Sequence, residues 1–508
     1  MASAVESHSA ATANIAAVIR RFHDSKTPFR IYHGSTSSTR QRHSSSSNTV
    51  DISGLNHVLS VDQFRKTVLV EPNVPMDALA QHTLAYNLIP LVVMEFRGIT
   101  AGGGFSGTSG ESSSFKYGFF DRIVNSIEII LGNGERVNAS RTEQPDLFWG
   151  AASSFGTMGV VTLLEIQLRD VGPNPHLELE YLFADSMEAA LATMRHAISD
   201  PGSEFLDGIV FSKNEIVICK GRIKPHHPGF NAEPVQRFTR PEDEWFYIHA
   251  QKRMNEAISS QRIPVDYIPI EDYLFRYDRG AFWGGKYSFE YFLVPFTRWT
   301  RWLLDNTMGT RVMYHALHES GLAKQYIVQD VGVPFEKAEE FAHWLDDDKN
   351  FGHYPLWLCP LLTNASSEGG GLLTATQPIA NTVTNDDNKQ EFLLNFGIWG
   401  PGPTDRRQFI DINRKLEHKA DSLGGKKWLY AHTYYTEDEF WTIYDRKRYD
   451  VLREKYQAKS LPSLYEKVRM QIDDISPSWS QWLWSLRPFA GWYGAWKALA
   501  GGDYLIRK

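Results

Sequence analysis

The hydrophobic and polar positions of the first 170 residues alternate between helical and strand periodicities. Helical patterns are expected at 11–22 and at 76–87, and Pro75 marks the start of the second. Runs rich in branched and aromatic residues predict β-strands, at 29–33, 49–52, 67–70, 123–131 and the end of 154–168. The Asn133–Gly134 pair predicts a hairpin turn, because both residues tolerate positive φ. Both helices and strands are therefore expected in this part of the chain.

The pattern changes near residue 170, where we expect a domain boundary. A helix is predicted over 187–198, with capping residues at 185–186. The runs 208–211 and 215–219 predict a second hairpin. A Gly-, Thr-, Asn- and Asp-rich segment at 366–388 is expected to be a surface loop. No internal repeat with a period of 20 to 50 residues is visible.

Composition and charge argue against several classes of protein. The 508 residues include 53 Lys and Arg and 60 Asp and Glu, so the net charge is −7, which argues against a nucleic-acid partner. Two cysteines cannot build a disulfide scaffold or a zinc cluster, and no metal site is predicted. The N-terminus lacks the pattern of a secretory signal, and no apolar run reaches the length of about 18 residues that spans a membrane. We therefore expect an intracellular, cytoplasmic protein.

Aromatic residues are unusually frequent, at 13% with 15 Trp. They are typical of a large aromatic core, and also of an apolar cavity or a lipid interface. Five Trp lie between residues 479 and 500. This Trp-rich tail either packs on the preceding domain or makes a peripheral contact with an internal membrane.

The segment 97–114 is rich in Gly and Ser, and we expect no regular helix there. Its 102–107 run matches G-x-G-x-x-G, but a weak strand before it and poor helix formers after it argue against Rossmann binding. Two loops, 34–39 and 100–108, could instead clamp a diphosphate between backbone N–H groups, which suits a flavin dinucleotide. Small residues at 156–161 would let a planar ring approach the backbone. The alternative is that both loops are flexible surface loops.

These segments, in this order, resemble the vanillyl-alcohol-oxidase/p-cresol-methylhydroxylase (PCMH) FAD fold. More narrowly, the chain resembles the Δ24-sterol reductases of the Diminuto and seladin type. The sequence GESSSFKYGFF at 110–120 is the most specific match. Supporting matches at 205–218, 353–362 and 430–456 spread the resemblance over most of the chain.

The resemblance implies an α+β fold in three parts of the chain. Residues 1–170 would form a PCMH-type FAD-binding domain of two mixed α/β subdomains, and 171–433 a cap over the substrate. Residues 434–508 would return to the FAD domain. The cofactor-binding residues would be Gly34, Ser35, Thr36, Ser37, Ser38, Thr39, Thr100, Gly102, Gly103, Gly104, Ser106, Gly107, Thr108, Ser112, Gly118, Gly156, Gly159, Val160 and Val161.

Two positions depart from the family pattern. Members with covalent flavin carry a His where Ser37 or Ser38 stands, so the resemblance implies non-covalent FAD. Phe115 stands where the sterol reductases place a His, close to the expected flavin site.

Reduction of an isolated alkene needs an acid as well as a hydride, because the double bond is not polarised. Tyr117 and Glu111 are the catalytic residues we predict, and Glu95, Lys116 and Tyr434 are further candidate acids. A Glu111–Lys116 ion pair that only fixes the glycine-rich loop is the structural alternative.

The resemblance implies an FAD-dependent oxidoreductase that reduces a carbon–carbon double bond in a sterol or terpenoid with NADPH. One alternative is an FAD-dependent oxidase or dehydrogenase of a secondary metabolite. The other is a non-catalytic sterol-binding protein. The shared fold does not decide among them.

Overall fold

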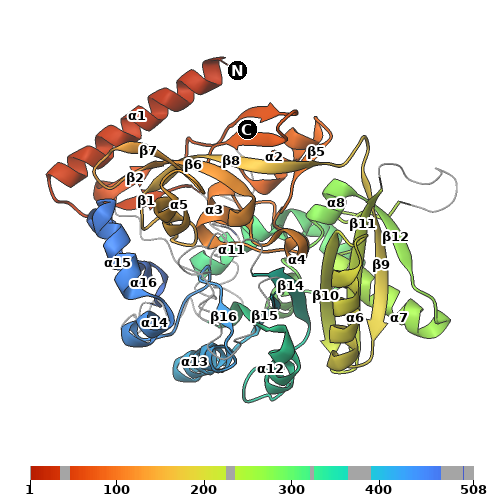
Figure 1. Cartoon of the computed structure of the whole chain (residues 1–508). Helices are drawn as coiled ribbons and strands as arrows, with labels where there is room; N and C mark the ends of the chain where they lie inside the picture. The colour runs from red at the N-terminus through yellow and green to blue at the C-terminus, as the bar shows by residue number, and fades with distance from the viewer. Residues whose placement is uncertain are drawn as a thin grey trace, which may run out of the picture.

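The computed structural model describes residues 2–34, 46–224, 235–320, 325–363, 391–470 and Trp496. Its N-terminal part is built on a six-stranded sheet in the order β3-β4-β8-β6-β7, with β5 also paired to β8 (Figure 1). A parallel pair, β1 and β2, lies beside it. The strands are β1 Arg30–Tyr32, β2 Thr49–Asp51, β3 Val58–Asp62, β4 Thr67–Val70, β5 Leu88–Pro90, β6 Val124–Ile130, β7 Arg136–Ser140 and β8 Val160–Asp170. The helices are α1 Ala2–Asp24, α2 Met76–Leu84, α3 Ala101–Gly107, α4 Ser114–Tyr117 and α5 Pro145–Ala151.

The second part is an eight-stranded antiparallel sheet in the order β12-β9-β11-β10-β14-β15-β13-β16. Its strands are β9 His176–Ala184, β10 Phe205–Ser212, β11 Glu215–Lys224, β12 Val265–Pro269, β13 Tyr326–Pro334, β14 Leu356–Leu362, β15 Phe392–Pro401 and β16 Lys426–Lys427. Its helices are α6 Met187–Ser199, α7 Phe246–Ser260, α8 Ile270–Leu274, α9 Gly284–Tyr291, α10 Arg298–Leu303, α11 Thr310–Ser320, α12 Ala338–Leu345 and α13 Arg406–Ser422.

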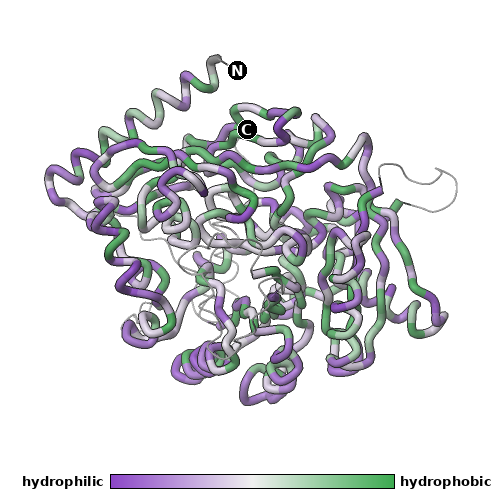
Figure 2. Tube along the Cα trace, viewed as in Figure 1, coloured by the Kyte–Doolittle hydropathy of each residue, from purple (hydrophilic) through white to green (hydrophobic). Residues whose placement is uncertain are grey.

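Strand periodicity explains how the second sheet buries both faces. Along β11, Ile216 and Ile218 pack with α6, α12 and α13, while Val217 and Cys219 face the core that includes α7. Successive strand side chains point to opposite faces, so one apolar strand supplies two cores. The trace of α13, which packs on this sheet, is mostly hydrophilic (Figure 2).

The C-terminal helices return to the first sheet. They are α14 Glu437–Ile443, α15 Arg446–Lys455 and α16 Leu464–Val468. The buried Arg453 guanidinium donates to the carbonyl of Thr157 at 2.9 Å and to three carbonyls of its own segment. Lys455 pairs with Asp146 of α5 at 2.6 Å. These contacts attach α15 to the segment 146–157, which precedes β8 in the chain.

Most elements expected from the sequence are confirmed, as is the α+β class. Both hairpins form, β6 with β7 and β10 with β11. Ser186 caps α6 by accepting a hydrogen bond from the amide of Ala189 at 3.2 Å. The expected loop at 366–388, residues 35–39 and the Trp-rich tail apart from Trp496 lie outside the described residues.

The expectation that 97–114 holds no regular helix is wrong, because α3 occupies its centre. Thr100 caps this helix by accepting from the amide of Gly103 at 3.1 Å. A Cβ on Gly102 would lie 2.6 Å from Cβ of Pro72, and one on Gly104 would lie 2.5 Å from Cε of Met94. Tertiary packing that only glycine permits therefore outweighs the poor helix propensity of glycine.

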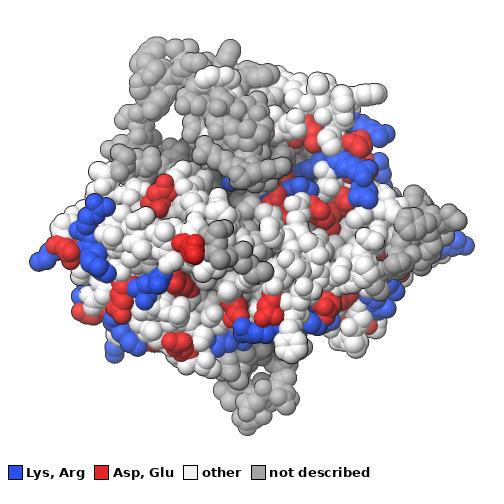
Figure 3. Space-filling view, turned by 90° about the horizontal axis from the view of Figure 1, so that it is seen from above, with Lys and Arg blue, Asp and Glu red and all other residues white. Residues whose placement is uncertain are grey.

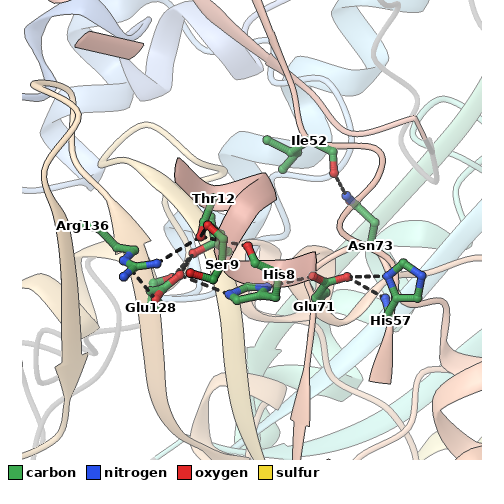
Figure 4. Close-up of polar contacts among 10 residues, drawn as sticks. His8, Ser9, Thr12, Ile52, His57, Glu71, Asn73, Glu128 and Arg136 are labelled. Carbon is green, nitrogen blue, oxygen red and sulfur yellow. Dashed lines mark hydrogen bonds and ion pairs between the residues drawn. The ribbon is translucent and has the colours of Figure 1, made fainter. Parts of the chain in front are cut away.

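Helix α1 is longer than predicted and docks through a buried polar network (Figure 4). Nδ1 of His8 lies 2.8 Å from Oε1 of Glu71 on one side, and Nε2 lies 3.3 Å from Oε1 of Glu128 on the other. Glu71 also accepts from His57 at 3.0 Å. The two carboxylates raise the pKa of His8 to about 9, through their hydrogen bonds first and their charges second.

The surface carries both signs of charge. Acidic and basic side chains are interspersed on the face shown in Figure 3. Among the helices of the described ranges, none is both long enough and apolar enough to cross a bilayer.

Candidate functional site

Three glycine-containing segments meet at the edge of the first sheet. Phe155 and Ser153 donate backbone hydrogen bonds to Ser106 and Phe105 of α3, at 3.1 and 3.3 Å. A Cβ on Gly156 would lie 3.1 Å from Cδ1 of Ile31, in the strand that leads to Gly34. The segment after β1, helix α3 and residues 153–159 are therefore neighbours, although more than 100 residues separate the first from the last.

The backbone of residues 153–156 has a conformation that would let a ligand approach it closely. Ser153, Phe155 and Gly156 all have positive φ, at 64°, 52° and 75°. Such conformations cost energy in non-glycine residues and cluster where a ligand or a catalytic group must be placed. The exposed Gly103 adds a short stretch of backbone without a side chain on α3. An extended polar group such as a dinucleotide diphosphate fits these features.

Several predicted cofactor residues have a role in packing or backbone geometry. A Cβ on Gly159 would lie 2.8 Å from the carbonyl oxygen of Ile130, so β8 can begin against β6 only with glycine there. Val160 and Val161 are buried at the start of β8. Gly118 ends α4 with a φ of 75°. These residues could contact a cofactor only through their backbone.

Thr108 and Ser112 have hydroxyls that are already paired. The Thr108 hydroxyl hydrogen-bonds to that of Ser153, which joins α3 to the 153–159 segment. The Ser112 hydroxyl donates to Oε2 of Glu111 at 2.7 Å and accepts from the hydroxyl of Tyr273 at 3.2 Å. Ser106 donates to the carbonyl of Gly102 at 2.7 Å within α3.

Buried carboxyl groups gather where the two sheets face each other. Glu95 precedes α3, Glu111 follows it, and Asp330 lies on β13 of the second sheet. Asp330 accepts hydrogen bonds from the Tyr430 hydroxyl at 2.5 Å and from Nδ2 of Asn395 at 2.9 Å. Burial raises the pKa values of Glu111 and Asp330, although their hydrogen bonds oppose the shift.

Glu95 is the carboxyl group of this cluster with the least support from hydrogen bonds. Its Oε2 atom is inaccessible to water and has no hydrogen-bond partner among the described residues. Loss of hydration, followed by repulsion from Asp330 and Glu111, raises its pKa to about 8. A side chain of this kind is a neutral carboxylic acid at pH 7, which can give up a proton.

Aromatic rings from both parts of the chain pack around Phe96, the residue that follows this acid. The ring of Phe96 is 5.3 Å from that of Phe282 and 5.7 Å from that of Trp399. Tyr314 of α11 packs on Trp399 at 6.3 Å. Such a wall excludes water and presents π-faces to any group held in front of it.

Comparison with known proteins finds an FAD-binding domain and relatives that match most of the chain. Residues 8–140 match a protein-family model described as an FAD binding domain. The chain is 27% identical over 420 residues to the Δ24-sterol reductase of Homo sapiens, covering 81% of this chain and 76% of the relative. The Arabidopsis thaliana Δ24-sterol reductase is 27% identical over 444 residues, with 83% and 76% covered. The chain is an FAD-dependent oxidoreductase related to the Δ24-sterol reductases.

A relative from a third group of organisms also matches most of the chain. A Δ24-sterol reductase homologue of Caenorhabditis elegans is 26% identical over 436 residues, or 81% of this chain and 77% of the relative. In this chain, the family model begins within α1 and ends with β7, so it includes α3 and Gly34. The carboxyl cluster uses two residues from that region and one from the second sheet.

The two catalytic residues predicted for this chain lie in different surroundings. Glu111 belongs to the buried carboxyl cluster. The Tyr117 hydroxyl instead lies 3.4 Å from Nη1 of Arg169, which also pairs with Glu204 at 2.7 Å.

The other residues singled out in the sequence are engaged elsewhere. Lys116 donates to the carbonyl of Ser203 at 3.4 Å, so the expected ion pair with Glu111 does not form. Tyr434 packs near Phe409 of α13, with 6.3 Å between their rings. Phe115 is buried in the core beneath the second sheet.

Three polar residues of this site were not predicted from the sequence, namely Asp330, Asn395 and Tyr430. More than 200 residues separate them from Glu95, and no local motif surrounds them. The only available signal was a polar residue inside an otherwise apolar strand pattern, at Asp330 in β13 and at Asn395 in β15.

Proposed function

We propose that this chain reduces an isolated carbon–carbon double bond in a sterol or related terpenoid, with NADPH as the electron donor. The names of its relatives suggest the substrate class. The observation that carries the proposal is the Glu95 carboxyl group, whose Oε2 atom is buried without a hydrogen-bond partner among the described residues and whose pKa is raised to about 8 by loss of hydration. Alkene reduction needs such an acid in a dry site.

In this reaction Glu95 holds a proton on its carboxyl group and donates it to one alkene carbon. The other carbon then acquires the character of a tertiary cation, which Phe282 and Trp399 would stabilise through their π-faces. Bound FAD would supply the redox chemistry, which is the transfer of a hydride from NADPH to the substrate. The net reaction adds one proton and one hydride to the alkene and oxidises NADPH to NADP⁺.

The residues we assign to hold FAD are those of the three converging segments, together with Thr100 and Gly103 of the α3 N-terminus. Glu111 and Asp330 act on the acid rather than on the alkene. Their charges help keep Glu95 protonated, so both are positioning residues. We propose non-covalent attachment, as expected from the serines at 37 and 38.

Product analysis tests this proposal. The purified holoprotein is incubated without oxygen with NADPH and a Δ24-sterol, and the sterol is examined by gas chromatography and mass spectrometry. We expect a side chain that has gained two hydrogens, one of which comes from solvent in heavy water. Flavin reduced by a metabolite and reoxidised by oxygen, with no sterol product, would favour the oxidase alternative. Sterol binding without turnover would favour a binding protein.

A further inference from the structure

Exposed apolar side chains concentrate on α10 and in the segment that joins α9 to it. Of the twelve large apolar side chains exposed in the described ranges, four lie within residues 293–303. They are Leu293 at 85% exposure, Trp299 at 79%, Trp302 at 51% and Leu303 at 72%. We call these four residues the α10 patch. Scattered exposed apolar residues need no explanation, but a cluster of this kind marks an interaction surface.

The α10 patch is held in place by the fold. Helix α10 begins with a capping box formed by Thr297 and Thr300, and none of its residues is buried. Leu293 has a φ of 55°, so the turn holds this apolar side chain outward at a conformational cost. Beneath the turn, the ring of Phe296 packs on the buried Trp245 at 5.5 Å.

The charges around the patch indicate the partner. Arg298 and Arg301 of α10 form no ion pair within the described residues, and the Arg301 guanidinium lies 4.8 Å from the ring of Phe296. The nearby acids are engaged, Glu290 with Lys286 at 4.0 Å and Asp305 with Arg279 at 2.6 Å. Trp beside Arg on a short exposed helix suits the headgroup region of an anionic bilayer.

We propose that the α10 patch is a docking surface for an anionic lipid bilayer. Trp299, Trp302 and the two leucines enter the interfacial region, while Arg298 and Arg301 contact lipid phosphates. The patch is connected to the aromatic wall of the site, because Trp283, just before α9, donates to the carbonyl of Trp399 at 2.7 Å. The proposal does not rest on the substrate suggested above.

Vesicle co-sedimentation of the full-length holoprotein tests this proposal. The patch variant is Leu293→Ser/Trp299→Ser/Leu303→Ser. The matched control replaces exposed apolar residues elsewhere, Phe64→Ser/Ile263→Ser/Val451→Ser, and retained flavin verifies that both variants fold. With sterol-free phosphatidylcholine vesicles containing phosphatidylserine, we expect at least about tenfold weaker binding for the patch variant, with the control unchanged.

Two results would overturn the proposal. One is vesicle binding by the patch variant equal to that of wild type. The other is a wild-type dimer that ignores vesicles and becomes monomeric in the patch variant, because the surface would then serve a second copy of this chain. Analytical ultracentrifugation of the same samples distinguishes these outcomes.

Discussion

Replacing Glu95 with Gln should have opposite effects on two properties of the protein, its folding stability and its catalytic turnover. Burial and neighbouring carboxylates raise the pKa of Glu95 from 4.5 to about 8. A shift of about 3.5 units, at about 1.4 kcal/mol per unit, corresponds to at most about 5 kcal/mol. The Oε2 atom of Glu95 is inaccessible to water, but the residue as a whole keeps partial solvent exposure, which screens the effect, so we expect about 2 to 4 kcal/mol.

The sign follows from proton binding. Between pH 4.5 and 8 the unfolded chain has lost the Glu95 proton while the folded chain retains it, so the free energy of unfolding falls as pH rises. Glu95→Gln removes this dependence. The variant should therefore exceed wild type in stability by a margin that grows from pH 4.5 to 8 and is constant above.

Activity should change in the opposite direction. Gln cannot donate the proton, so we expect turnover to fall about 10²- to 10⁴-fold while flavin stays bound. In wild type, turnover should decline about tenfold per pH unit above pH 8, as Glu95 ionises. Urea unfolding followed by circular dichroism and NADPH-dependent sterol turnover, each across pH, give the two readouts.

A matched control is Glu165→Gln, which changes a half-buried carboxylate that pairs with Arg65 at 3.0 Å. This variant should keep wild-type turnover and show no growing stability margin. Wild-type turnover in Glu95→Gln, or a stability margin that does not change with pH, would refute the reasoning.

Three further outcomes follow from the contacts described above. His8→Gln should lower the protection of the α1 amides from hydrogen exchange about ten- to a hundredfold below pH 6.5, and this difference should vanish above pH 9. The reason is that a His with a raised pKa contributes stability only while it is protonated. Gly102→Ala should lower the free energy of unfolding by about 1 to 3 kcal/mol, because the new Cβ would clash with Pro72, whereas Gly103→Ala should weaken FAD binding with little loss of stability. Thermal unfolding and flavin release measure the two effects. Tyr117→Phe should keep turnover within about twofold, since its hydroxyl contacts Arg169; a hundredfold loss would restore Tyr117 as the acid.

Local periodicity predicted much of the fold because strands such as β8 and β11 and helices such as α2 carry their own pattern. It failed at α3, where the helix depends on glycines that contact Pro72 and Met94. The buried carboxyl cluster was only half predictable for a related reason. Glu95 and Glu111 flank a visible glycine-rich segment, but Asp330 reaches them only through the strand order of the second sheet.

The docking of α1 on the first sheet could not be predicted from the sequence for the same reason. His8 meets Glu71 and Glu128 across 63 and 120 residues, so no spacing in the sequence marks the network. Packing across such separations is decided by the assembled sheets rather than by local preference.

The central claim is an FAD enzyme that takes electrons from NADPH. Its most direct test is the absorbance spectrum of the purified protein during an anaerobic titration with NADPH. We predict a yellow protein whose flavin band bleaches in proportion to added NADPH and recovers when a Δ24-sterol follows. A flavin that stays oxidised in excess NADPH would contradict the account.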